Sequence, residues 1–184
     1  FNIVKKTISI IVIIFSQISN SFAEDISNII IEKLSQEGFK TCKKMGLGEH
    51  LFTDNLIKIL DISNDLIEDI VIDTSKQRCK ESSSIFAGGT GGNNFIFFIN
   101  PTMKTINSWT SSKIDENETK GIFKIFIRSY DIINWEGKSA LKIQLHGVEC
   151  GVDGATGCYS IVSVSENGFK ILQNPLPNPS YSLN

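Results

Sequence analysis

Histidine is almost absent from this 184-residue sequence, which contains only His50 and His146. Neither an H-E-x-x-H pattern nor a G-x-S-x-G pattern occurs, so zinc hydrolases and α/β-hydrolases lose their usual sequence support. Clustered basic residues are also missing, because the formal net charge is −2 and charges of both signs are interspersed. Nucleic acids and anionic membranes bind proteins through concentrated positive charge, so we expect neither as a partner.

No apolar run reaches the roughly 20 residues that a membrane-spanning helix needs. The longest run near the start, Ile8–Phe15, follows the positive pair Lys5 and Lys6 and precedes the small residues that end at Ala23. This order of charge, apolar core and small residues is typical of a secretory signal peptide. We therefore expect residues 1–23 to be cleaved, and the mature protein to be periplasmic or secreted without a stable membrane anchor.

The four cysteines contain no C-x-x-C pair, and their scattered spacing lacks the paired arrangement that zinc sites use. In an exported protein an even number of cysteines indicates disulfides. Three pairings are possible in principle. The glycine-rich segment between Cys150 and Cys158 is flexible enough to bring its ends together, which predicts that bridge. Cys42–Cys79 follows by elimination.

Apolar residues at helical spacing predict one helix that begins near Asp25 or Ser27 and ends at Gly38. The remaining sequence contains short runs rich in Ile, Val and Phe, several of which alternate apolar with polar residues as half-buried strands do. The segment 166–168, Glu-Asn-Gly, predicts a hairpin turn. The expected strands are Asp69–Asp73, Asn94–Asn100, Lys104–Trp109, Ile122–Arg128, Leu141–His146, Tyr159–Ser165 and Phe169–Leu172.

A helix followed by consecutive strands predicts a mainly β (α+β) fold, with the N-terminal helix packed on one or more antiparallel sheets. The expected single domain covers residues 24–173 and is disulfide-stapled. The proline-rich tail over residues 174–184 is expected to be extended or disordered.

The segment 61–69 places oxygen-bearing side chains at loop positions one, three, five and nine. These residues are Asp61, Ser63, Asp65 and Asp69. Calcium prefers such hard oxygen ligands, which makes the four residues a candidate calcium site. The pattern resembles the D-x-[DN]-x-D-G-x-x-D loops of EF-hand-like and FG-GAP-type repeats, but Leu66 stands where glycine normally relieves a strained turn. The alternative is a polar β-turn before a strand.

A wider resemblance rests on this loop and two later segments. They are the glycine-rich run 83–92 and the run 145–151, Leu-His-Gly-Val-Glu-Cys-Gly, with Cys158-Tyr159 after it. From Cys42 to Leu172 the chain resembles a family of uncharacterised exported proteobacterial proteins with a degenerate DxNxDGxxD loop and an HGxxCG segment. The resemblance implies a periplasmic location and the two disulfides, and it implies no activity. Ala87 and Asn93 stand where family members often carry a further cysteine pair.

These observations leave more than one class of function open. The main interpretation is a non-enzymatic binding or structural domain, with calcium as a candidate stabilising ion and an unknown protein or envelope component as partner. The alternative is a small exported hydrolase that uses His146 with Asp153 or Glu149. An inhibitor or envelope-stress factor is a third possibility, which an exposed apolar patch would reveal.

Overall fold

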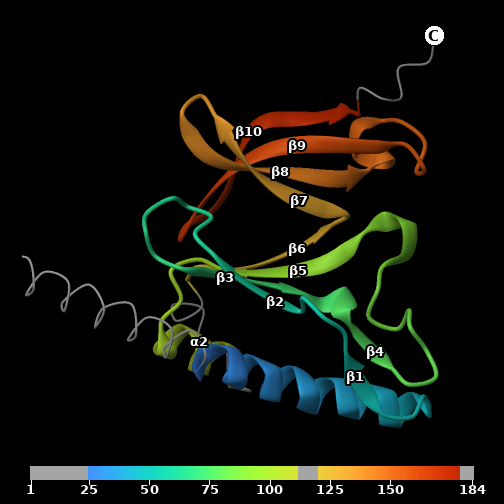
Figure 1. The fold of residues 1–184 in the computed structure, drawn as a ribbon. Coiled ribbons are helices and arrows are strands. Elements are labelled where there is room, and N and C mark those ends of the chain that lie inside the picture. Colours follow the sequence, from blue (N-terminus) through green and yellow to red (C-terminus); the bar gives the residue numbers. More distant parts are fainter. Residues whose placement is uncertain (1–24, 112–119, 179–184) are drawn as a thin grey trace, which may run out of the picture.

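The computed structural model describes residues 25–111 and 120–178 (Figure 1). The signal peptide expected over residues 1–23 lies outside the described residues, as does the end of the chain from residue 179. The fold has three layers, with a four-stranded antiparallel sheet in the middle. A long helix lies on one face of this sheet, and a second four-stranded antiparallel sheet lies on the opposite face. The predicted fold class, a mainly β domain with an N-terminal helix on antiparallel sheets, is therefore confirmed.

The N-terminal helix, α1, is described over residues 25–45 and is the blue helix of Figure 1. Ile26, Ile30 and Leu34 recur every four residues, so they lie on one face of α1, and all three are buried. They form one core cluster with Ile72 and Phe98 of the sheet above them. Packing of this apolar face fixes α1 against the sheet.

The predicted end of this helix at Gly38 is wrong, because α1 continues to residue 45. Gly38 lies in the middle of the helix and faces His50. A Cβ atom at position 38 would collide with the imidazole ring of His50. The glycine therefore serves a close tertiary contact rather than helix termination, a difference that the sequence pattern alone does not reveal.

The first sheet has the strand order β2-β3-β5-β6, with every pair antiparallel. Its strands are β2 (Ile57–Leu60), β3 (Asp69–Asp73), β5 (Asn93–Phe98) and β6 (Ile122–Ile127). Alternate residues of a strand point to opposite faces. Ile72 and Phe98 accordingly face α1, whereas Val71, Phe95 and Phe97 face the second sheet.

The second sheet has the order β10-β9-β8-β7, again antiparallel throughout. Its strands are β7 (Ser129–Trp135), β8 (Lys138–His146), β9 (Gly157–Ser165) and β10 (Gly168–Pro177). Leu141 and Val162 pack against the first sheet and complete a second core cluster between the sheets. The predicted hairpin turn is confirmed, since Ser165 pairs with Gly168.

The predicted tail starts too early. Residues 174–177 belong to β10, where Leu176 pairs with Tyr159 and Pro177 pairs with Cys158. The strand is irregular in this part, with register shifts after Ile171 and Gln173. Such irregularity suits proline at a sheet edge, where no ladder hydrogen bond from its nitrogen is required.

The predicted strand Lys104–Trp109 is wrong, because this segment is a helix, α2 (Met103–Thr110). The Thr102 hydroxyl caps α2 by accepting a hydrogen bond from the backbone N–H of Thr105 at 3.1 Å. Ile106 is fully buried, and the Trp109 ring packs edge-on against Phe98 with centroids 5.2 Å apart. Apolar residues three positions apart thus face the core from a helix.

A short two-stranded sheet joins β1 (His50–Phe52) to β4 (Gln77–Cys79). The Cys42–Cys79 disulfide links the C-terminal part of α1 to β4, which confirms the predicted bridge. Together, the bridge and the small sheet hold this end of α1 against the rest of the fold.

The second predicted bridge is not formed, because Cys150 and Cys158 carry free thiols. Each thiol donates a hydrogen bond to a backbone carbonyl at 3.3 Å, Cys150 to Gly147 and Cys158 to His146. Burial, together with a hydrogen bond to the Cys150 side chain, raises the pKa of Cys158 to about 12. The intervening loop therefore brings the two thiols together, as its glycines predicted, but no disulfide joins them.

Candidate functional site

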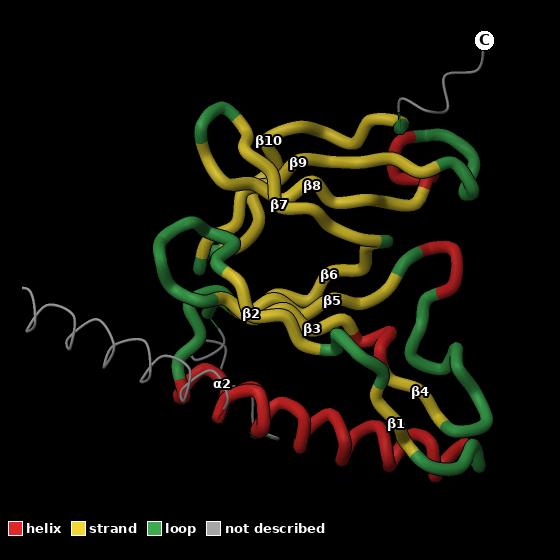
Figure 2. The backbone as a smooth tube through the Cα atoms, viewed as in Figure 1, coloured by secondary structure: helices red, strands yellow, loops and turns green. Residues whose placement is uncertain are grey.

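The predicted calcium loop connects β2 to β3 and extends toward the second sheet (Figure 2). The Ser139 hydroxyl of β8 donates to the Ile62 carbonyl of this loop at 2.6 Å. Asp69, which is fully buried, accepts backbone N–H bonds from Ile62 at 2.8 Å, Ser63 at 3.2 Å and Asn100 at 2.9 Å. Burial raises the pKa of Asp69, while the three N–H bonds act in the opposite direction.

Asp61 and Asp65 also direct their oxygens at N–H groups. The Asp61 carboxylate accepts from the backbone of Asp65 at 3.2 Å and of Leu66 at 2.9 Å. Asp65 accepts from the backbone of Ile67 at 3.0 Å and from the Asn100 side chain at 2.9 Å. Leu66 occupies the glycine position of the calcium pattern with φ of 71°, and its side chain is 93% exposed.

The structure therefore brings the predicted carboxylates into one loop and uses them to order its backbone. Within residues 25–111 and 120–178, no group of three or more His, Cys, Asp or Glu side chains could hold a metal ion. The calcium interpretation gains no support from this geometry. The polar-turn alternative describes the observed hydrogen bonds.

His146, on which the hydrolase alternative depends, ends β8 and lies against Gly154, where a Cβ atom would collide with its ring. Asp153 instead accepts bonds from the N–H of Ala155 at 2.9 Å, and from the N–H and hydroxyl of Thr156 at 3.0 and 2.6 Å. These bonds from Thr156 lower the pKa of Asp153. Among the described residues no hydrogen bond joins the His146 ring to Asp153 or Glu149, so the geometry does not assemble the hydrolase arrangement.

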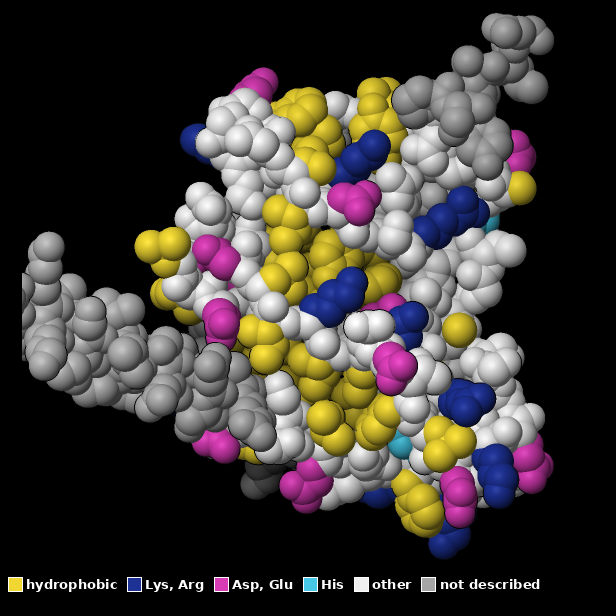
Figure 3. Space-filling model, in the orientation of Figure 1, with side chains coloured by type: hydrophobic (Ala, Val, Ile, Leu, Met, Phe, Trp, Pro, Cys, Tyr) yellow, Lys and Arg dark blue, Asp and Glu magenta, His cyan; other side chains and the backbone are white. Residues whose placement is uncertain are grey.

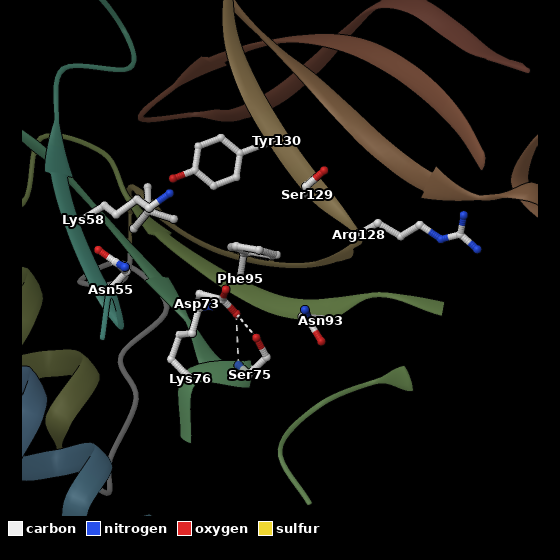
Figure 4. Close-up of a pocket in the computed structure, with 11 residues that line it drawn as sticks. Asn55, Lys58, Asp73, Ser75, Lys76, Asn93, Phe95, Arg128, Ser129 and Tyr130 are labelled. Atoms are coloured by element: carbon white, nitrogen blue, oxygen red, sulfur yellow. Dashed lines mark hydrogen bonds between the residues drawn. The ribbon is translucent and has the colours of Figure 1, made fainter. Parts of the chain in front are cut away.

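A cleft of about 500 Å³, which no sequence pattern predicts, opens between the two sheets. We call it the inter-sheet cleft. Figure 4 shows its lining, which comes from β2, the end of β3, η1 (Thr74–Lys76), β5 and the start of β7. Its lining includes Lys58, Val71, Asp73, Lys76, Phe95 and Tyr130.

Strand register explains why these side chains meet. Lys58 of β2 pairs with Val71 of β3, and Asp73 of β3 pairs with Phe95 of β5. Directly paired residues, and residues two apart on a strand, share one face of a sheet. The four side chains therefore lie on the face that looks toward the second sheet. Where Leu141 packs on this face, its residues are apolar. At the cleft, the same face carries the charged side chains of Lys58 and Asp73.

Tyr130 supplies the opposite wall from β7. Its ring packs edge-on against Phe95 and Phe97, with centroid distances of 5.6 and 5.4 Å. Its hydroxyl is buried and has no hydrogen-bond partner among the described residues. Burial, followed by the nearby charge of Asp73, raises the pKa of Tyr130 to about 12. The hydroxyl therefore stays protonated at neutral pH as a donor without an acceptor, which typically costs about 1–3 kcal/mol.

The cleft is also rich in positive charge. The Lys58 ammonium lies 5.7 Å from the centre of the Tyr130 ring. Neither Lys58 nor Lys76 forms an ion pair with any described residue. Asp73 is engaged by the N–H and hydroxyl of Ser75 at 3.0 and 2.6 Å. Figure 3 shows basic side chains beside an apolar area on this face of the molecule.

Arg128 joins β6 to β7 at the far end of the cleft, and its guanidinium points away from Tyr130 (Figure 4). It donates to the carbonyls of Thr90 at 2.9 Å, Gly154 at 2.7 Å and Ala155 at 3.5 Å. Arg128 thus ties the glycine-rich turn η2 (Gly89–Gly91) to the loop before β9. Its charge adds to the positive potential of the cleft, but each of its three nitrogens already donates a hydrogen bond to a backbone carbonyl.

Comparisons with known proteins give no indication of function, so the fold and the cleft are the main evidence for it. No family model, curated protein or solved structure matches the chain. The resemblance to an exported proteobacterial family therefore stays a prediction. In the described part of the chain, no helix combines the length and the apolar character that crossing a membrane requires.

Proposed function

We propose that this protein is an exported, non-enzymatic binding domain that takes a small molecule into the inter-sheet cleft. The observation that carries the proposal is the Tyr130 hydroxyl, a buried donor without a partner in the wall of a cavity of about 500 Å³. Small-molecule sites commonly have volumes of about 300–1,000 Å³, with apolar walls and a few convergent polar groups. The protein or envelope partner expected from the sequence stays a prediction.

Two features support export. The Cys42–Cys79 disulfide is of the kind that persists in oxidising compartments. Residues 1–23 carry the pattern of a secretory signal peptide. N-terminal sequencing of the exported chain tests this part of the proposal, and we expect Glu24 to be the first residue.

The chemistry of the cleft supports binding rather than catalysis. Its lining includes no histidine and no cysteine among the described residues. The Ser75 hydroxyl, which lies in the wall, donates to Asp73 at 2.6 Å as part of the cap of η1. This serine therefore has a local structural role, and it is not paired with a neutral base that would activate it as a nucleophile.

A titration followed by NMR tests the proposal directly. The oxidised, 15N-labelled chain is titrated separately with benzamide, benzoate and benzylamine, which share a ring and differ in charge. We expect saturable shift changes at residues of the inter-sheet cleft with at least one probe. Tyr130→Phe should weaken that binding by roughly 2- to 10-fold, the effect of one lost hydrogen bond.

Tyr159→Phe is the matched control. Tyr159 also has a lysine over its ring, since the Lys142 ammonium lies 4.5 Å from the ring centre, but it lies on β9 outside the cleft. This variant should leave binding unchanged. The proposal would be contradicted by probes that leave the cleft residues unperturbed, or by equal effects of the two tyrosine substitutions.

A further inference from the structure

We infer that the ligand of the inter-sheet cleft is a small organic anion, bound through the ammonium groups of Lys58 and Lys76 and the hydroxyl of Tyr130. This inference rests on the proposed function and names the class of molecule that the cleft selects. The shared chemistry is an anionic head, a carboxylate or a phosphate monoester, on a short apolar body.

The charges of the cleft are the first observation that favours an anionic ligand. The lining of the cleft contains three basic side chains, Lys58, Lys76 and Arg128, and one carboxylate, Asp73. The chain as a whole has a formal net charge of −2. Positive charge is therefore concentrated locally in a protein that is acidic as a whole. A cleft with low-dielectric walls focuses such a field and raises the local concentration of ions of the opposite sign.

The pairing of the lysines carries the second step. Elsewhere in the described chain, Lys33 pairs with Glu37 at 3.0 Å and Lys120 pairs with Glu166 at 3.1 Å. Lys58 and Lys76 have no such partner, which is true of most described lysines, but these two line one concave site together. Asp73 is held toward η1 by Ser75, which leaves the two ammonium groups available to a ligand.

Tyr130 supplies the third observation, because its protonated hydroxyl, which protein atoms cover in this structure, can donate a hydrogen bond to an anion once neighbouring side chains move aside. Hydrogen bonds between a neutral donor and a charged acceptor are shorter and stronger than those between neutral groups. A cationic ligand could not accept this bond and would be repelled by both lysines. A neutral amide could accept it, so the experiment must separate the effect of charge from the effect of shape.

The walls favour an organic anion over a bare inorganic ion. Val71 and Phe95 lie at the floor of the cleft and are only 1% and 6% exposed, and the half-buried Tyr130 ring, which packs edge-on against Phe95, adds apolar surface beside the charged groups. An apolar group of a ligand would cover this surface while its anionic head reaches the lysines. This division of a site into apolar walls and a few orienting polar groups is usual for small-molecule ligands.

The test compares probes that differ only in the head group. The oxidised chain is titrated with benzoate, phenyl phosphate and benzamide, and shifts of the cleft residues are followed by NMR. We expect at least one anion to bind roughly tenfold or more tightly than benzamide, the gain typical of a charge-assisted hydrogen bond. Whether benzoate or phenyl phosphate binds more tightly identifies the natural head group.

Charge variants supply the control. The double substitution Lys58→Gln and Lys76→Gln should abolish the preference for the anion, while Lys142→Gln, on β8 and over the ring of Tyr159, should preserve it. Benzamide that binds as tightly as both anions would overturn the inference and leave the proposed function intact. Failure of every probe at the cleft would overturn both.

Discussion

The buried carboxylate of Asp69 accepts a hydrogen bond of 2.9 Å from the backbone N–H of Asn100, which lies 31 residues further along the chain. The same carboxylate accepts the N–H groups of Ile62 and Ser63, so one side chain joins the β2–β3 loop to the end of β5. Ser139 then connects this loop to the second sheet. The loop from residue 61 to 68 is thus linked by hydrogen bonds to both sheets.

Replacing Asp69 tests this structural role. Asp69→Ala would leave three backbone N–H groups without their acceptor, so we expect the free energy of unfolding to fall by about 3–5 kcal/mol. Asp69→Asn keeps one acceptor oxygen and should cost less. Asp61→Ala should cost less than about 1 kcal/mol, because its donors, the backbone N–H groups of Asp65 and Leu66, belong to exposed residues and can bond to water instead. Urea unfolding measures all three, and equal losses for Asp69→Ala and Asp61→Ala would refute the account.

The pH dependence of stability should also report Asp69. Because burial raises its pKa above that of the unfolded chain, the folded state holds this proton more tightly. The contribution of protonated Asp69 to the free energy of unfolding is therefore fully present below about pH 4. It is lost as the pH rises through the pKa that Asp69 has in the folded protein. Urea unfolding across this range should show the decline in the wild type and not in Asp69→Asn. Identical pH profiles for both proteins would contradict the assignment.

Calcium should leave the melting temperature unchanged. The oxygens of Asp61, Asp65 and Asp69 already accept N–H bonds, and a cation would have to displace several of them. We expect melts in millimolar calcium and in chelator to overlay. A rise in melting temperature with calcium, abolished by Asp61→Ala, would instead establish the loop as an ion site.

Gly38→Ala should destabilise the protein, although alanine is ordinarily the better helix residue by about 1 kcal/mol. The added Cβ would collide with the His50 ring, and overpacking of this kind typically costs about 1–3 kcal/mol. In a His50→Ala background the same substitution should become stabilising. A double-mutant cycle by thermal or urea unfolding measures this reversal. Additive effects of the two substitutions would show that the ring is not the obstacle.

Loss of the Cys42–Cys79 bridge should lower the free energy of unfolding by about 3–4 kcal/mol, because it closes a sequence separation of 37 residues. The double substitution Cys42→Ala and Cys79→Ala removes the bridge. Cys150→Ala removes a half-buried free thiol and serves as the control, with a smaller expected loss. Comparable losses in the two variants would contradict the assignment of one bridge and two free thiols.

Much of the fold follows from local sequence pattern. The bounds of β3 were predicted as observed, since an apolar run between two aspartates indicates a strand wherever it lies. The Asn167-Gly168 turn and the apolar face of α1 are equally local signals. Cys42–Cys79 followed by elimination from the expected Cys150–Cys158 bridge, which itself did not form.

Other features depend on contacts that no local pattern contains. The local sequence of the segment that forms α2 predicts a strand. Only the tertiary structure shows that Ile106 and Trp109 pack against the same core from a helix. The local sequence predicts a helix end at Gly38, and only the tertiary contact with His50 explains the glycine. The inter-sheet cleft gave no sequence signal, because Lys58, Asp73 and Tyr130 lie on different strands and only strand pairing brings them together.

A crystal structure of the oxidised chain grown with millimolar benzoate tests the central claim most directly. The account predicts a benzoate in the inter-sheet cleft, with its carboxylate within hydrogen-bonding distance of the Tyr130 hydroxyl and beside the Lys58 and Lys76 ammonium groups. A benzoate bound elsewhere, with the Tyr130 hydroxyl bonded to a protein group, would contradict it.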